Sequence, residues 1–293
     1  MLKRTIAGII MTAVLFLVIF LTKYSQFIFD ALLMIVCIVA TYEMYGATRR
    51  ADTKIEGRNG YNPSIVSLIV ALIIIYPLSH FFGFIGLLFT AILSVLVAFM
   101  FFIFDSKKSF NDFTVNVFLL FYPLIFIGLL FVLGESYGMI PIMLAVGIST
   151  ISDAFACWVG AAIGKRKMFP KISPKKTVAG FVGGIFGGGV GAIIVYLIFE
   201  MASFPTNIKF TFGGLVGDKV FITIIIYAVI GFIVALFSEI GDLAASRIKR
   251  EVGIKDYGKI LGSHGGVMDR IDSIMFTSVC IAVIMQIIEL IVK

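Results

Sequence analysis

Of the carboxylates that stand inside or at the ends of strongly apolar segments of this 293-residue chain, five have a spacing that could form a site. Glu239 and Asp242 are three residues apart and would share one face of a helix, and Asp269 and Asp272 repeat that spacing before the last apolar segment. Asp153 lies within the apolar sequence STISDAFACWVG. A carboxylate at the centre of a bilayer costs roughly 2.5–3.5 kcal/mol on insertion scales. One such acid is explained by an ion pair or a charged helix end, but several acids near two basic segments indicate a site.

The ligands that these acids offer are oxygens. Mg²⁺ prefers oxygen ligands, keeps several waters, and is usually held by one or two carboxylates together with substrate phosphates. The three cysteines, Cys37, Cys157 and Cys280, all lie in apolar segments without paired spacing, which indicates neither a disulfide framework nor a zinc site. The acids therefore predict a site for Mg²⁺ and a phosphate-bearing substrate.

Two basic segments, residues 164–177 and 246–271, each carry six Lys and Arg residues. The first reads GKRKMFPKISPKKT and ends in Lys175, Lys176 and Thr177, directly before an expected helix. A helix N-terminus with cations and a hydroxyl group beside it attracts anions. Both segments are therefore predicted to bind phosphate groups.

The cations also have a simpler explanation. Lys and Arg collect in cytoplasmic loops of membrane proteins and contact anionic lipid headgroups, which accounts for Lys165 to Lys167 without any site. It does not account for the acids among the cations or for the turn His264-Gly265-Gly266. Carboxylates, a metal and cations together are the parts of phosphoryl or nucleotidyl transfer. The chain has no P-loop sequence, so a nucleotide would need another kind of binding site.

The elements that must position these residues are membrane helices. The mean hydropathy is +1.09 and only 14% of the residues are charged, which is far from the range of soluble domains and predicts an all-α, polytopic integral membrane protein. The first apolar segment is too long for a signal-peptide core and lacks a cleavage site, so we expect it to stay in the protein. We expect about nine spans, at 5–22, 27–46, 63–80, 81–104, 113–134, 139–163, 178–200, 220–245 and 272–292.

Nine spans would place the two termini on opposite sides of the membrane. Of the 24 Lys and Arg residues, 20 would then lie on the side of the N-terminus and only 4 on the other. Positive charge marks the cytoplasmic side. We therefore expect a cytoplasmic N-terminus and an active site that faces the cytoplasm from the cell (inner) membrane.

Chemically active residues concentrate in the second half of the chain. We expect residues 1–135 to form a scaffold of transmembrane helices, and residues 136–293 to form the catalytic region with its cytoplasmic loops 164–177 and 246–271. The glycine-dense stretch Gly183 to Gly191 predicts close packing between helices, or else a broken helix that lines a cavity.

The sequence SRIKREVGIKDYGKILGSHGGVMDRID, residues 246–272, resembles position by position the signature of the phosphatidate cytidylyltransferases, also called CDP-diacylglycerol synthases. We call it the signature segment. The upstream sequences SDAFACWVG and SPKKT and the glycine-rich span are also similar to that family, so the resemblance covers residues 145–293. This chain departs from the family at Ala179, where a glutamate is common.

The resemblance implies an enzyme that converts CTP and phosphatidic acid to CDP-diacylglycerol and pyrophosphate. It implies a requirement for Mg²⁺, with a second cation in a paired site. The expected partners are these two substrates and membrane lipids, with no nucleic acid, and a homodimer is compatible with the resemblance.

The resemblance also assigns roles to individual residues. Phosphatidate is already ionised at neutral pH, so His264 is expected to donate a hydrogen bond to phosphate rather than to accept a proton. The glycines of the turn would let the backbone approach phosphate. The metal ligands would be Asp242, Asp269 and Asp272, and the other catalytic residues Lys255, His264 and Arg270. The substrate-binding residues would be Asp153, Lys175, Lys176, Thr177, Ser246, Lys249, Arg250, Gly265 and Gly266.

Four other functions share some features of this pattern. A CTP-dependent lipid-alcohol kinase and a synthase acting on ether-linked lipid would use the same parts. A CDP-alcohol phosphotransferase would need a different spacing of acids from the one around Asp242 and Asp272. A cation-coupled transporter would explain acids in the membrane, but transporters usually show repeat symmetry between halves, which this chain lacks.

Overall fold

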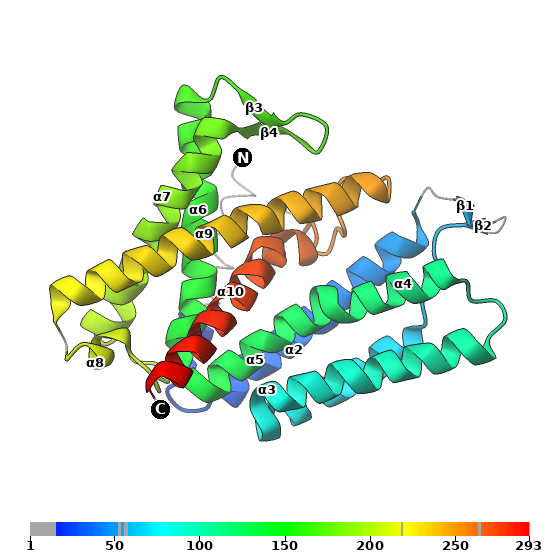
Figure 1. The fold of residues 1–293 in the computed structure, drawn as a ribbon, viewed down its shortest axis with the longest axis horizontal. Coiled ribbons are helices and arrows are strands. Elements are labelled where there is room, and N and C mark those ends of the chain that lie inside the picture. Colours follow the sequence, from blue (N-terminus) through cyan, green and yellow to red (C-terminus); the bar gives the residue numbers. More distant parts are fainter. Residues whose placement is uncertain (1–15, 52–53, 56–57, 218, 263–264, 293) are drawn as a thin grey trace. The chain divides into compact units, whose positions relative to one another are not determined.

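The computed structural model describes residues 16–51, 54–55, 58–217, 219–262 and 265–292. Most of the predicted span 5–22 and the predicted phosphate ligand His264 lie outside these residues. The described chain is almost entirely helical (Figure 1), which confirms the all-α prediction.

The helices follow the apolar segments of the sequence, and short loops join them. The helical elements are α2 (Phe27–Arg49), α3 (Ile65–Phe104), α4 (Phe110–Leu119), the π-helical turn η1 (Leu120–Ile125), α5 (Phe126–Tyr137), α6 (Met139–Ile163), α7 (Val178–Val195), the π-helical turn η2 (Tyr196–Met201), α8 (Phe212–Leu215), α9 (Val220–Glu251) and α10 (Met268–Val292). Two antiparallel hairpins add the strands β1 (Lys54–Ile55), β2 (Arg58–Asn59), β3 (Lys167–Phe169) and β4 (Ser173–Thr177).

Seven helices within the described residues are long and apolar enough to cross a membrane. One of them, α3, has 40 residues and covers the predicted span 81–104 and all but the first two residues of the predicted span 63–80. Its backbone is not helical at Gly83 (φ 55°, ψ −131°), and Gly86 lies directly against the carbonyl group of Leu78, so the chain turns back at this point. The multi-pass membrane protein is confirmed, while the count of nine spans and the cytoplasmic N-terminus stay predictions.

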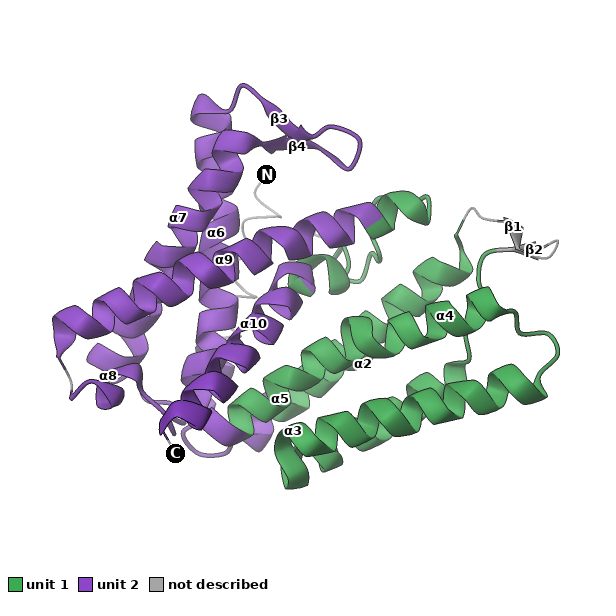
Figure 2. Cartoon of the chain, viewed as in Figure 1, with its two compact units in different colours: residues 1–6, 30–135, 248–271 green, residues 7–29, 136–247, 272–293 purple. Residues whose placement is uncertain are grey.

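The chain divides into two compact units (Figure 2). Unit 1 comprises residues 1–6, 30–135 and 248–271, and unit 2 comprises residues 7–29, 136–247 and 272–293. The signature segment is thus shared between the two units, and each unit is described by itself below.

Buried polar side chains fix the helix packing within unit 1. The Asn116 side chain in α4 accepts a hydrogen bond of 2.7 Å from the Ser67 hydroxyl in α3 and donates one of 3.0 Å to the Ser64 carbonyl. The helix α4 begins with a capping box in which Ser109 and Asp112 bond each other's backbone N–H groups.

Glycines allow the helices of unit 2 to pack closely, as the sequence predicts. A side chain at Gly187 would collide with Phe155 of α6, and one at Gly188 would collide with Ala235 of α9. The helix α7 is continuous from Val178 to Val195, so the glycines serve helix packing and do not break the helix. The close contact of α7 with α6 and α9 brings the chemically active residues of three helices together.

Candidate active site

A cavity of about 470 Å³ in unit 2 gathers predicted residues from three elements. We call it the polar hollow. Asp153 of α6 and Asp242 of α9 line it together with Lys175, Lys176 and Thr177 of β4. The β3–β4 hairpin lies at the end of α6 and at the start of α7 (Figure 1), and so carries its lysines to the adjoining ends of both helices. The structure therefore brings together five of the residues that the sequence predicts.

Lys176 links two carboxylates at this hollow. Its Nζ atom lies 2.7 Å from Oε2 of Glu239 and 2.8 Å from Oδ2 of Asp242, and it also donates to the Glu239 carbonyl at 3.3 Å. Burial opposes the charged form of Lys176, but the charges of Asp242 and Glu239 and the hydrogen bonds to both outweigh it, so its pKa is raised. Lys176 is therefore a fixed cation at neutral pH.

The two carboxylates of this pair differ in exposure. The Glu239 side chain is 0% exposed and also accepts from the Ser152 hydroxyl at 3.5 Å, whereas the Asp242 side chain is 33% exposed and lines the polar hollow. Gly184 of α7 makes room for the Glu239 carboxylate, because a Cβ atom there would collide with it. Glu239 thus holds Lys176 from inside the helix bundle, and Asp242 presents a carboxylate to a ligand.

Asp153 and Asp272 extend this group of acids. The Asp153 side chain is exposed to the polar hollow, and its charge interacts with those of Asp242, Glu239, Asp272 and Lys176. Asp272 is buried, and its Oδ1 atom accepts from the backbone N–H of Ser273 at 2.8 Å. Lys167 and Lys175 line the hollow as well as Lys176, so this region of unit 2 offers carboxylate oxygens to a cation directly beside lysines that can contact phosphate.

Thr177 lines the polar hollow and also has a structural part, while its contact with substrate stays a prediction. Its hydroxyl oxygen accepts a hydrogen bond of 3.1 Å from the backbone N–H of Gly180 and thereby caps the N-terminus of α7. Its methyl and hydroxyl groups also pack against Gly160 and Gly164 of the preceding segment. Lys175 is exposed and lines the polar hollow.

A second group of predicted residues surrounds Asp269 in unit 1. The Oδ1 atom of Asp269 lies 2.8 Å from Nζ of Lys249, and its Oδ2 atom accepts from the backbone N–H groups of Tyr257 at 2.9 Å and Gly266 at 3.0 Å. Lys249 also lies over the Tyr257 ring, 5.2 Å from its centroid. In this structure Asp269 holds the signature segment together at three points.

Glu43 of α2 is a residue of this group that sequence reasoning missed. It is buried, and its Oε2 atom accepts from the backbone N–H of Met268 at 2.9 Å. Cβ atoms at Gly258 and Gly266 would both collide with its carboxylate, so these two glycines leave the space that it fills. Its distance along the chain from the signature segment left no local signal for the contact.

Unit 1 also contains a cationic hollow of about 960 Å³. The predicted residue Lys255 lines it, and so do Lys259 and, from α2, Arg49 and Arg50. Tyrosine rings from α2 and the signature segment complete its wall. Cations beside aromatic rings suit a phosphorylated ligand with a planar group, and the arginines of α2 were not singled out from the sequence.

The remaining predicted residues have these positions. Gly265 has φ +82°, a conformation that favours glycine, and lies beside Asp269. Arg250 donates to the Ile254 carbonyl at 3.5 Å, in the last turn of α9. Ser246 is half-buried in α9, and Arg270 is exposed in the first turn of α10.

The polar hollow has the donor chemistry that Mg²⁺ requires. Two carboxylates, those of Asp153 and Asp242, line it and can serve as oxygen ligands. Among the described residues that line it there is one cysteine, the exposed Cys157, and no histidine. No cluster of three or more acidic, histidine or cysteine side chains with metal-site geometry occurs among the described residues. One or two carboxylates, completed by water and substrate phosphate, are the usual protein contribution to a Mg²⁺ site. The residues present fit that pattern.

Comparison with known proteins identifies the family. The model of the cytidylyltransferase family matches residues 2–288. The chain belongs to the cytidylyltransferase family. This family member is 35% identical over 173 residues to the phosphatidate cytidylyltransferase of Aquifex aeolicus (strain VF5), which covers 59% of this chain and 57% of the relative.

Two further relatives of this family member are similar over a shorter range. The phosphatidate cytidylyltransferase of Bacillus subtilis (strain 168) is 37% identical over 143 residues, 48% of this chain and 46% of the relative. That of Staphylococcus aureus (strain COL) is 35% identical over 142 residues, 48% of this chain and 47% of the relative. The chain spans about half the length of the curated relatives that it matches.

Proposed function

We propose that this chain is a phosphatidate cytidylyltransferase of the cell (inner) membrane, which makes CDP-diacylglycerol and pyrophosphate from CTP and phosphatidate. The observation that carries the proposal is the polar hollow, where Asp153 and Asp242 stand beside Lys175 and Lys176 at the boundary of membrane-spanning helices. Family membership and the names of the relatives support the same reaction.

The reaction needs little acid–base chemistry from the protein. An ionised oxygen of the phosphatidate phosphate attacks the α-phosphorus of CTP, and the bond from that phosphorus to the oxygen bridging to the β-phosphate breaks, which releases pyrophosphate. Bound Mg²⁺ would neutralise charge on the phosphates. Asp242 and Asp153 would hold it, with Asp272 close by, and Lys176 and Lys175 would contact phosphate oxygens. Asp269 as a further metal ligand and a second cation remain predictions from the resemblance.

Two labels on CTP test the reaction and separate it from its nearest alternative. Purified protein in vesicles with phosphatidate and Mg²⁺ should transfer the label of α-³²P CTP to lipid and release that of γ-³²P CTP as pyrophosphate. Transfer of the γ-label to lipid would instead show a kinase, and transfer of neither label would contradict the proposal.

The native cysteines give a second, independent test. Cys157 is exposed and lines the polar hollow, whereas Cys37 and Cys280 are buried. A thiol reagent should therefore modify Cys157 first, and Mg²⁺ with CTP or with phosphatidate should slow that modification. Equal rates with and without substrates would show that the substrates bind elsewhere.

The proposed orientation places the polar hollow on the cytoplasmic side. In a Cys157→Ser background, Lys175→Cys and Lys255→Cys should react with a membrane-impermeant thiol reagent only when it is added from the cytoplasmic side. Labelling from outside would reverse the orientation. A homodimer is compatible with the resemblance to the family. Crosslinking of the same cysteine variants would report whether the protein forms one.

A further inference from the structure

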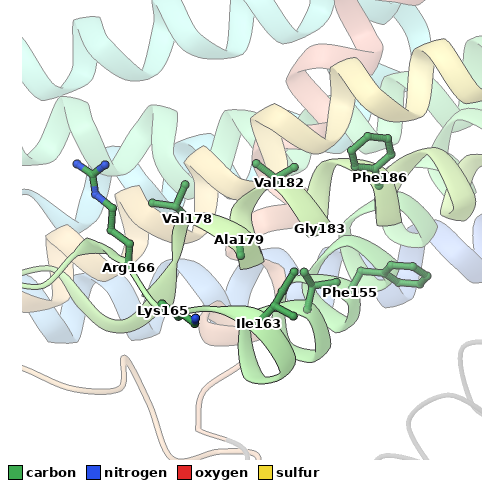
Figure 3. Close-up of a pocket in the computed structure, with 10 residues that line it drawn as sticks. Phe155, Ile163, Lys165, Arg166, Val178, Ala179, Val182, Gly183 and Phe186 are labelled. Carbon is green, nitrogen blue, oxygen red and sulfur yellow. The ribbon is translucent and has the colours of Figure 1, made fainter.

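Unit 2 has an apolar groove of about 690 Å³ in addition to the polar hollow. The helices α6 and α7 form its walls, with Phe155, Val159 and Ile163 from the first and Val182 and Phe186 from the second. The acids of the polar hollow do not line it. Figure 3 shows the two phenylalanines at one end of the groove and Lys165 and Arg166 at the other. The groove is therefore apolar along its length and cationic at one end.

The length of the groove matches half a bilayer. At about 1.5 Å of rise per residue, the helical stretch from Phe155 to Ile163 is about 12 Å long. One leaflet contributes about half of a hydrocarbon core that is about 30 Å thick. Lys165 and Arg166 directly follow α6, and α7 begins at Val178, so the cationic end lies where both helices reach the membrane boundary. An acyl chain in the groove would place its headgroup at these cations.

The two cations are available for a ligand. Both side chains are exposed, and neither forms an ion pair with any other described residue. The backbone carbonyl of Arg166 accepts from the N–H of Val178 at 3.0 Å, which ties the cationic loop to the start of α7. The charge is therefore held at the mouth of the groove while the side chains remain free to bind.

We propose that this groove binds one phosphomonoester lipid, with an acyl chain between α6 and α7 and its phosphate on Lys165 and Arg166. A phosphate monoester carries about −1.5 to −2 charges at pH 7, because its second pKa is about 6. Two adjacent cations match that charge better than the single charge of a phosphodiester headgroup. The choice of a phosphomonoester lipid rests in part on the proposed function, and the groove would be a site for that lipid separate from the polar hollow.

The only tryptophan of the chain makes binding measurable without any reaction. Trp158 is 67% exposed on α6, and its ring centroid lies 5.8 Å from that of Phe155, which lines the groove. Bromine atoms on a lipid acyl chain quench tryptophan fluorescence on contact. In vesicles of phosphatidylcholine, dibrominated phosphatidate should quench Trp158 more strongly than dibrominated phosphatidylcholine or phosphatidylglycerol at equal mole fraction.

Charge variants test the mouth of the groove. Lys165→Gln and Arg166→Gln should each weaken the preference for phosphatidate about fivefold, as expected for one surface cation near a lipid phosphate. Lys171→Gln removes a cation from the same hairpin but outside the groove, and should change nothing. If the charge variants left the preference intact, Lys165 and Arg166 would serve membrane topology alone and the proposal would fail.

Two substitutions of Ala179 that differ only in charge test the interior of the apolar groove. Ala179 lines the groove on α7, and Ala179→Glu and Ala179→Gln add side chains of the same size. Only the glutamate opposes a lipid phosphate, so Ala179→Glu should lose the preference while Ala179→Gln keeps most of it. Equal quenching by all three lipids would show ordinary bilayer lipid in the groove, and equal quenching by phosphatidate and phosphatidylglycerol would refute the phosphomonoester. The quenching assay contains no CTP and therefore does not depend on the reaction. A protein that shows the preference here but makes no CDP-lipid in the separate assay with CTP would refute the proposed function and leave the groove standing.

Discussion

Two lysine–carboxylate groups within the described part of the chain are built in opposite ways. In unit 2 one lysine, Lys176, is shared between two carboxylates, one buried and one facing a hollow. In unit 1 one carboxylate, Asp269, is shared between a lysine and two backbone N–H groups. The first arrangement leaves carboxylate oxygens for a ligand, whereas the second uses both oxygens to hold a loop. An acidic residue of a family signature can therefore hold the surrounding backbone by hydrogen bonds, and its presence in the signature does not by itself make it a ligand for metal or substrate.

The largest expected effect comes from removing the shared lysine. Lys176→Met leaves Glu239 buried without its cation, which should lower the free energy of unfolding by about 3–5 kcal/mol. Lys176→Met combined with Glu239→Gln should recover much of this loss, because no buried charge remains. Unfolding in detergent solution measures both, and a double variant no more stable than Lys176→Met would contradict the account.

The raised pKa of Lys176 fixes the pH dependence of this contribution. A lysine whose pKa is raised by folding stabilises the protein fully below its ordinary value of 10.5 and loses that contribution only as the pH rises through the raised value. Lys176 should therefore stay charged from pH 7 to pH 9. The difference in the free energy of unfolding between the wild-type protein and Lys176→Met, measured at both pH values, should be the same as far as this lysine is concerned.

Asp242→Asn should separate chemistry from stability. It removes a carboxylate from the polar hollow while Lys176 keeps its pair with Glu239. The rate of CDP-lipid formation should fall about 10²–10³-fold, as for loss of one electrostatic group in an active site, with little change in unfolding. A large loss of stability would show that Asp242 serves structure first.

Asp269→Asn should instead affect both quantities. Loss of the charge weakens three hydrogen-bonding contacts, and a hydrogen bond to a charged group contributes about 1.5–3 kcal/mol to stability. Activity should also fall, because the signature segment loses its organising group. Hydrogen exchange at Tyr257 and Gly266 measures the loosening, and unchanged protection there would refute the structural role.

The smallest expected effect concerns Glu43. Gly266→Ala would drive a Cβ atom into the Glu43 carboxylate and should destabilise unit 1 by about 1–3 kcal/mol. Glu43→Asp, which shortens that side chain, should recover part of the loss in the double variant. Additive losses would show that the two residues do not share the space between them.

The sequence predicted the parts of this molecule that depend on local pattern. Apolar runs gave the helices, and Asp153, Asp242 and the lysines before α7 were predicted as site residues that the structure brings to one hollow. The boundary between the predicted spans 63–80 and 81–104 was placed close to Gly83, where the backbone turns. These features are readable because helix formation and burial follow the nearest residues in the chain.

Contacts between distant segments could not be predicted in the same way. Glu43 meets the backbone of Met268 from a helix more than 200 residues earlier, and its own neighbours are ordinary span residues. Thr177 was predicted to bind an anion, which stays a prediction, and the N-cap that it forms was not predicted although its position just before a helix fits that part. The resemblance predicted Asp269 as a metal ligand. It did not indicate that Asp269 forms an ion pair with Lys249 and accepts two backbone hydrogen bonds within unit 1.

The most direct test of the account measures CDP-lipid synthesis and unfolding together for Asp242→Asn. Purified protein in vesicles would receive α-³²P CTP, phosphatidate and Mg²⁺, and the wild-type protein is expected to label the lipid. Asp242→Asn should fold with unchanged stability and label the lipid about 10²–10³ times more slowly. A stable variant that labels lipid at the wild-type rate would contradict the claim that the polar hollow is the active site.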